Sequence, residues 1–195
     1  MMTMKKPTMH LPPAEAAKVR EAYASASVIV EYGSGASTLI AIEEGATVFS
    51  VESDRDWSES MEKWASLHQG SGRAILHHVD IGPTGAWGRP TDGARWRDFI
   101  HYPMSVWNRS DLSSPDVVLI DGRFRVACFI STIINIKRPV TVLFDDYADR
   151  RHYHRVEAIQ PPAHMIGRMA VFEVTPHILG NNDWLRFGEY FFDPD

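Results

Sequence analysis

The stretch from Val28 to Thr38 constrains the fold of this chain more than any other part of the sequence. It opens with a short apolar run, passes through Gly33 and Gly35, and ends in residues that suit the start of a helix. Glycines at such a turn permit backbone conformations that other residues avoid, and they let the main chain approach a ligand closely. The stretch predicts a buried strand, a tight turn and a helix, with Glu31 two residues before the first glycine.

Further short apolar runs along the chain alternate with stretches of helical character. Strands that are apolar on both faces are typical of a parallel sheet covered by helices on both sides. The sequence therefore predicts an α/β fold with a doubly wound, mostly parallel sheet of seven strands and an antiparallel edge. The expected strands are 28–31, 47–52, 74–79, 117–121, 140–144, 165–174 and 185–192, and the expected helices are 14–26, 37–44, 55–68, 124–136 and 150–159.

The domain organisation follows from length and local composition. A chain of 195 residues is expected to form one domain spanning 1–195. Residues 1–11 are expected to form a loose arm. Residues 81–115 combine glycine, arginine and tryptophan, which predicts a lid or insertion, because long connections in compact domains are usually functional or disordered and aromatic residues argue against disorder.

Composition excludes several classes of protein. The net charge of −5 disfavours a nucleic-acid partner or an anionic membrane surface. No apolar stretch approaches the roughly 20 residues that span a bilayer, and no secretory signal is visible. The single cysteine, Cys128, lies in an apolar run and excludes an internal disulfide, which fits a buried thiol in a reducing compartment. We therefore expect a cytoplasmic protein.

Acidic residues close or follow five of the predicted strands. They are Glu31, Glu52, Asp80, Asp121 and Asp145. The carboxyl ends of parallel strands share one edge of the sheet, and ligands of open α/β folds bind there. A single acid at such a position is equally well explained as a helix cap or a solvated turn. Five of them together predict a ligand site.

The type of ligand follows from what the glycine turn lacks. Thr38 stands where the dinucleotide fingerprint has its third glycine, and no Gly-Lys-Ser/Thr run is present for a phosphate-binding loop. Glu31 would repel a pyrophosphate, whereas its carboxylate suits a ligand with a positively charged end. An amino group or a sulfonium would meet that requirement.

The run EYGSGAS at 31–37 resembles the first motif of the class I S-adenosylmethionine-dependent methyltransferases. The likeness extends over nearly the whole chain from about residue 14, and Ser37 departs from the glycine that many members have. The resemblance implies a Rossmann-like fold and S-adenosylmethionine as cofactor. It assigns the methionine portion to the turn, the ribose to the acid after the second strand and the adenine to the acid after the third. The implied cofactor-binding residues are Glu31, Gly33, Ser34, Gly35, Ser37, Glu52 and Asp80.

Three aspartates follow the fourth and fifth predicted strands, namely Asp121, Asp145 and Asp146. Neighbouring carboxylates repel one another unless a cation compensates, and oxygen ligands suit Mg²⁺. The arrangement is similar to that of the metal-dependent catechol-type O-methyltransferases, although Phe124 stands where that subfamily keeps a lysine. The alternative is that the aspartates cap helices and pair with nearby arginines. Candidate catalytic residues are Asp121, Asp145 and His152.

Arginines after the fourth and fifth strands, together with the aromatic residues of 81–115, suit an anionic or aromatic small-molecule acceptor. A solvated helix face would explain the arginines equally well. The leading hypothesis is methyl transfer from S-adenosylmethionine to an oxygen or nitrogen atom of a small or medium-sized acceptor. The alternatives are a catalytically inactive relative that binds the nucleoside, and an NAD(P)-dependent reductase, against which Glu31 and Thr38 argue.

Overall fold

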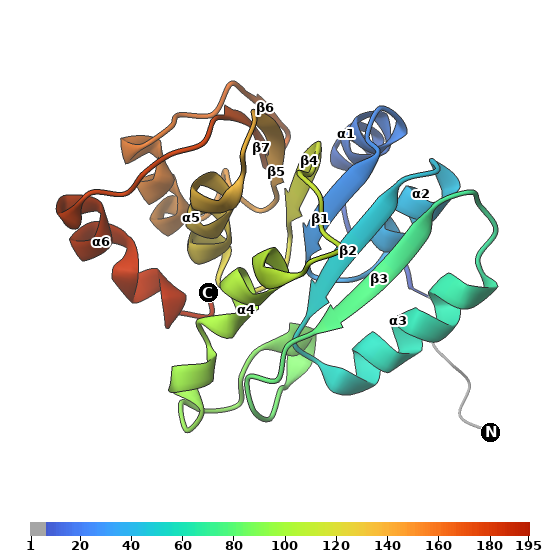
Figure 1. Ribbon diagram of the computed structural model, residues 1–195, viewed down its shortest axis with the longest axis horizontal. Helices are drawn as coiled ribbons and strands as arrows, with labels where there is room; N and C mark the ends of the chain where they lie inside the picture. Colours follow the sequence, from blue (N-terminus) through green and yellow to red (C-terminus); the bar gives the residue numbers. More distant parts are fainter. Residues whose placement is uncertain (1–6) are drawn as a thin grey trace.

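The computed structural model describes residues 7–195, and in that range it forms one seven-stranded sheet of order β3-β2-β1-β4-β5-β7-β6 (Figure 1). The first five strands are mutually parallel, and β7 runs antiparallel to β5 and β6. The strands are β1 (Val28–Tyr32), β2 (Thr47–Glu52), β3 (Arg73–His78), β4 (Val117–Ile120), β5 (Val140–Phe144), β6 (His164–Ile166) and β7 (Met169–Val174).

Helices connect the parallel strands. Proline in the first turn starts α1, and the Asp54 carboxylate starts α3 by accepting from the Trp57 backbone N–H at 2.8 Å. The α-helices are α1 (Pro13–Ala24), α2 (Ala36–Glu43), α3 (Arg55–Leu67), α4 (His101–Met104), α5 (Arg125–Asn135) and α6 (Asn181–Phe187). The 3₁₀ helices are η1 (Ala86–Gly88), η2 (Trp96–Asp98), η3 (Ser105–Asn108), η4 (Arg151–Ala158) and η5 (Gly188–Phe191).

The sheet separates two apolar layers because side chains alternate between its faces. In β1, Val30 and Tyr32 point into a layer shared with α4, α5 and α6, whereas Ile29 points into a layer shared with α1 and α2. Met61 of α3 packs on α2 beside that second layer. Figure 1 shows α1, α2 and α3 on one side of the sheet and α4 and α5 on the other. The predicted doubly wound α/β fold is confirmed.

The predicted antiparallel edge is confirmed, but its strands differ from the expected ones. The expected strand 165–174 is a hairpin of β6 and β7 that turns at Gly167 and Arg168. Gly167 has φ +54°, and a Cβ there would lie 2.1 Å from Oε1 of Glu15. The Glu15 carboxylate accepts from the Arg168 N–H at 2.8 Å, so α1 holds the turn of this hairpin.

The expected strand 185–192 was wrong, because this stretch is helical and belongs to α6 and η5. Asp183 starts α6 by accepting from the Gly180 N–H at 2.9 Å. Phe187, Tyr190 and Phe191 are buried at helical spacing, whereas Leu185 is 86% exposed. The buried apolar residues of this run therefore follow the period of 3.6 that is typical of a helix.

Three further expectations concern smaller segments. The helix expected at 150–159 is the 3₁₀ helix η4, and Cys128 is buried as expected. The first six residues of the expected arm lie outside the described residues, while Leu11 is buried against the second apolar layer.

Among the described residues, 7–195, none of the helices combines the length and apolar character that crossing a membrane requires.

Candidate functional site

The turn after β1 meets the turn after β4 backbone to backbone. Gly33 has φ +94°, and a Cβ there would lie 2.8 Å from the Cα and N atoms of Gly122. The Asp121 N–H donates to the Tyr32 carbonyl at 3.0 Å. A Cβ on Gly35, by contrast, would have no heavy atom within 4 Å. Gly33 therefore allows the two turns to pack closely, whereas Gly35 leaves space open beside its turn.

Glu31 lies beneath the turn and is fully buried. Its carboxylate accepts hydrogen bonds from the hydroxyls of Ser37 and Thr38 in α2, and from Ser50 Oγ in β2 at 2.7 Å. Burial raises the pKa of Glu31 to about 7, although the three hydroxyl groups lower it. Glu31 thus joins β1, β2 and the start of α2.

The raised pKa of Glu31 gives a prediction for stability. Because the folded protein retains the Glu31 proton up to about pH 7, the free energy of unfolding should fall by about 3 kcal/mol between about pH 4.5 and 7. Glu31→Gln has no carboxyl group to titrate at this position. The free energy of unfolding of the variant, relative to that of the unsubstituted protein, should therefore rise across that interval and stay constant above it. Urea unfolding at several pH values measures this, with the exposed Glu21→Gln as control. Parallel curves for Glu31→Gln and the unsubstituted protein would contradict it.

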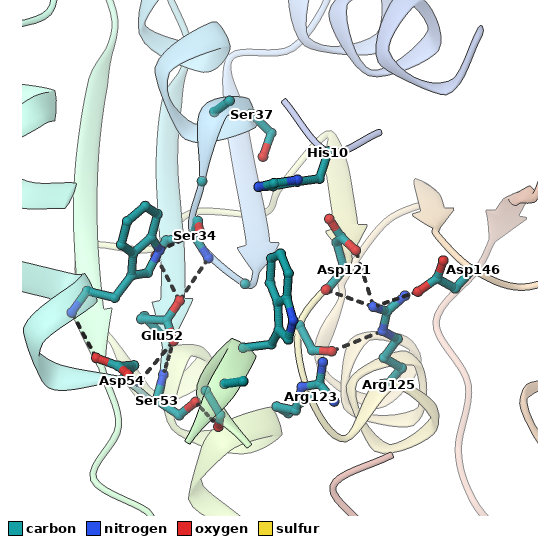
Figure 2. A pocket seen from close by; sticks show the side chains of 18 of the residues that line it. His10, Ser34, Ser37, Glu52, Ser53, Asp54, Asp121, Arg123, Arg125 and Asp146 are labelled. Carbon is teal, nitrogen blue, oxygen red and sulfur yellow. Dashed lines mark hydrogen bonds and ion pairs between the residues drawn. The ribbon is translucent and has the colours of Figure 1, made fainter. Parts of the chain in front are cut away.

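Glu52 ends β2 and faces the open side of the turn (Figure 2). Its Oε2 accepts from the Ser34 N–H at 3.2 Å and from the Ser34 hydroxyl at 2.9 Å, and its Oε1 accepts from the N–H groups of Ser53 and Asp54 at 2.8 and 2.9 Å. Trp57 Nε1 donates to the Ser34 carbonyl at 2.9 Å, which fixes the turn from its far side. Burial raises the pKa of Glu52 despite these donors.

Asp121, Asp145 and Asp146 come together as expected, each offering an oxygen within 4.8 Å of the others. Asp145 is fully buried, and Arg168 donates to both of its oxygens, from Nε at 3.0 Å and from Nη2 at 2.7 Å. Asp146 adopts φ 57° and accepts from Arg150 Nη2 at 3.0 Å. The carboxylates are therefore paired with guanidinium groups.

Arg125 lies buried at the centre of this cluster. Its Nη2 reaches Oδ1 of Asp121 and Oδ2 of Asp146, both at 3.2 Å (Figure 2). Its other donors reach the carbonyls of Gly122 at 3.0 Å and Asp145 at 2.7 Å, and Nη2 also lies 3.0 Å from the Asp121 carbonyl. Arg125 thus ties the turns after β4 and β5 together.

The residues present do not fit the Mg²⁺ ion expected from the sequence. The charges that an ion would neutralise are neutralised by Arg125, Arg150 and Arg168. Both oxygens of the buried Asp145 accept from Arg168, and both oxygens of Asp146 lie within 3.2 Å of guanidinium nitrogens, so only Asp121 keeps an oxygen for an ion. The three aspartates pair with arginines, as expected from the alternative to a metal site.

A cleft of about 990 Å³ opens above the carboxyl ends of β1, β2, β4 and β5. One wall is formed by residues 8–11 and 84–88, where the rings of His10 and Trp87 meet edge to face at 5.1 Å. Tyr102, from the predicted insertion, lines it as well. The acid–arginine cluster also lines it, through Asp121, Arg125, Asp146, Arg150 and Arg168. The lining therefore comes from segments between residues 8 and 168 that lie far apart in the sequence.

The cleft brings some of the predicted residues together and leaves others out. Glu31 lies below the turn, and Asp145 is enclosed by Arg168. Asp80 is exposed, with Arg95 Nη2 at 3.6 Å from its carboxylate, and His152 is exposed with its ring against Tyr153. Within the described range, those four do not line the cleft. The predicted residues that do are Gly33, Ser34, Gly35, Ser37, Glu52, Asp121 and Asp146.

Two residues of the site have little signal in the sequence. Arg168 lies in the middle of the expected strand 165–174, although Gly167 beside it is a turn signal. His10 lies in the stretch expected to be a loose arm. Both reach the cleft through contacts between segments that are far apart in the sequence.

Comparison with solved structures gives a near match over the full chain. The crystal structure of a methyltransferase-like protein from Silicibacter pomeroyi is 44% identical, covers 98% of this chain and 100% of its own, and has a TM-score of 0.93. No protein-family model matches the chain, and no curated protein matches it either.

More distant structures share the fold. The O-methyltransferase TomG from Streptomyces achromogenes, involved in tomaymycin synthesis and solved with SAM, is 14% identical with a TM-score of 0.56, covering 86% of this chain and 82% of its own. Cofactor-bound Rv0187 from MTB is 13% identical with a TM-score of 0.62, covering 89% and 85%. At these identities the likeness concerns the fold alone.

Proposed function

The chain belongs to the class I S-adenosylmethionine-dependent methyltransferase-like family, and on that premise we propose that it transfers a methyl group from S-adenosylmethionine to an oxygen or nitrogen atom of a small or medium-sized acceptor. The observation that carries the proposal is the open space beside Gly35, flanked by the Glu52 carboxylate at the same turn. The fold of SAM-bound TomG supports the choice of cofactor.

The residues at the turn fit this cofactor. The Glu52 carboxylate faces the cleft, and its Oε2 can accept from a ribose hydroxyl once the Ser34 hydroxyl turns away, while Oε1 stays bonded to the N–H groups of Ser53 and Asp54. The open side of Gly35 and the Ser37 hydroxyl border the space for the methionine portion. Glu31 acts from below by holding Ser37 in place. When bound, S-adenosylmethionine supplies a methyl group activated by its sulfonium.

Asp121 is the proposed general base. Its side chain lines the cleft and is 33% exposed. Burial at the cleft floor, together with Asp145 and Asp146, raises the pKa of Asp121 to about 7, while Arg125 lowers it. A base works best when its pKa lies near the working pH. Arg125 would fix the orientation of Asp121, leaving Asp121 to accept the proton of the acceptor.

Ligand binding tests the cofactor assignment. S-Adenosylhomocysteine at about 100 times its dissociation constant should stabilise the protein by about 2.7 kcal/mol, a melting shift of about 5–11 °C. NADH and ATP should give no comparable shift. Gly35→Val should abolish the shift with the fold intact, because its side chain enters the open space and Gly35 has an extended φ of −175°. Gly93→Val, at another open glycine outside the cleft, is the matched control.

The outcomes separate this function from its rivals. A shift with NADH alone would overturn the proposal in favour of a reductase. A selective shift with S-adenosylhomocysteine, without turnover of any acceptor supplied with S-adenosylmethionine, would favour a catalytically inactive relative. Turnover of an acceptor would confirm the transferase.

A further inference from the structure

Arg123 differs from the other arginines of the cleft. Arg125, Arg150 and Arg168 each pair with one or more of the three clustered aspartates. Arg123 also lines the cleft, yet within residues 7–195 its guanidinium has no ion-pair partner, and its Nε is buried without an acceptor. This half of the cleft therefore carries one more guanidinium than the acids beside it neutralise.

A buried donor without an acceptor lowers the stability of a protein, and such groups are rare in native structures. Neighbouring Arg125, whose donors reach carbonyls and carboxylates, shows that arginines here can be satisfied by the protein itself. Burial and the charge of Arg125 lower the pKa of Arg123, so the guanidinium lies in surroundings that disfavour its charge. An anion entering the cleft would supply the missing acceptor and the missing charge.

The position of Arg123 indicates which ligand would bring that anion. The sheet order places Glu52 at the end of β2, the glycine turn after β1, and Arg123 after β4. Two strand spacings, roughly 10 Å, separate β2 from β4. With the nucleoside at Glu52, as in the proposed function, Arg123 lies toward the end where the acceptor meets the methyl group. Figure 2 shows Arg123 below Asp121, the proposed base.

We propose that Arg123 determines acceptor specificity by binding an oxyanion of the acceptor, either a carboxylate or a phosphate. The guanidinium offers two parallel N–H donors that match the two oxygens of such a group. Tyr102, whose hydroxyl accepts from the Arg123 backbone N–H at 3.4 Å, lies beside this position in the cleft. The inference rests on the proposed function, since that function places the acceptor at this end.

The ¹⁵N–¹H signal of Arg123 Nε reports binding directly. The protein is saturated with S-adenosylhomocysteine and titrated with benzoate, phenyl phosphate or benzamide, and the signal is assigned from its loss in Arg123→Lys. Benzoate or phenyl phosphate should shift it, and which of them binds more tightly identifies the oxyanion. Neutral benzamide should leave it in place. Arg123→Gln should bind the anion at least 10-fold more weakly. Arg97→Gln, which removes an equal charge at an exposed site outside the cleft, should not.

Three results would overturn the inference. The first is an Nε signal that neither anion shifts. The second is equal binding of benzoate to Arg123→Gln and Arg97→Gln. The third is a loss of S-adenosylhomocysteine binding in Arg123→Gln with 5′-methylthioadenosine binding retained, because Arg123 would then bind the carboxylate of the cofactor. If the unsubstituted protein binds no S-adenosylhomocysteine, the proposed function fails, and the same titrations of the ligand-free protein still decide whether Arg123 binds an oxyanion. The melting temperature of each variant establishes that it is folded.

Discussion

Replacement of Arg125 by Met is expected to lower the free energy of unfolding by about 3–5 kcal/mol, because removing one partner of a buried ion pair leaves the other charge uncompensated. The substitution deprives Asp121 and Asp146 of their shared guanidinium and also removes the donors to the carbonyls of Gly122 and Asp145. Urea unfolding followed by circular dichroism measures the loss.

Two further variants test whether charge is the cause. Combining Arg125→Met with Asp121→Asn removes the carboxylate that loses its guanidinium, since Asp146 keeps Arg150 and Arg168, and should recover part of the lost stability. Arg138→Met, at an exposed arginine paired with Asp116, should cost no more than about 1 kcal/mol. A loss in Arg125→Met as small as that in Arg138→Met would refute the central position assigned to Arg125.

Replacement of Asp121 by Asn is expected to slow methyl transfer by about 10²–10⁴-fold, the usual contribution of a positioned general base. The affinity for S-adenosylhomocysteine should stay within about 3-fold, since Glu52, to which we assign the ribose, and the glycine turn are untouched. Asn keeps an oxygen for the Arg125 donor, which lies 3.2 Å from the Asp121 carboxylate. The two effects together separate a role in catalysis from a role in binding.

The pH profile gives the sign of this effect. A base must be deprotonated to act, so kcat of the unsubstituted protein should rise with pH and level off above the raised pKa of Asp121, about 7. Asp121→Asn should lack that rise. Asp149→Asn, at an exposed position outside the cleft, should keep both the rate and the profile. An Asp121→Asn protein with the unsubstituted rate would exclude Asp121 as the base.

Local patterns predicted the part of the site that lies on the parallel strands. An apolar run ending in an acid is visible without knowledge of the fold, so Glu52 and Asp121 were placed at the correct edge of the sheet. The same reasoning did not distinguish Glu31, whose carboxylate turns under the glycine turn because three hydroxyls meet it there. Which way a side chain turns depends on partners that the spacing of the motif does not contain.

Contacts between distant segments account for the remaining differences. Arg168 neutralises Asp145, 23 residues earlier in the chain, and this pairing removed the reason to expect a metal. The helices over 185–192 were missed because the run mixes buried and exposed apolar residues, and packing against the α5 layer decides that Phe187 and Phe191 are the buried ones. Neither relation is recorded in the local sequence.

The turn between β6 and β7 also bears on the order in which the chain is synthesised. Asp145 leaves the ribosome 23 residues before the guanidinium that encloses it. At roughly 5–20 residues per second, that interval lasts about 1–5 s. Until Arg168 emerges, the carboxylate of Asp145 has no guanidinium partner, and its burial in the folded cluster is unfavourable. Completion of the hairpin then supplies the missing cation, so we expect the cluster to form only after Arg168 has emerged.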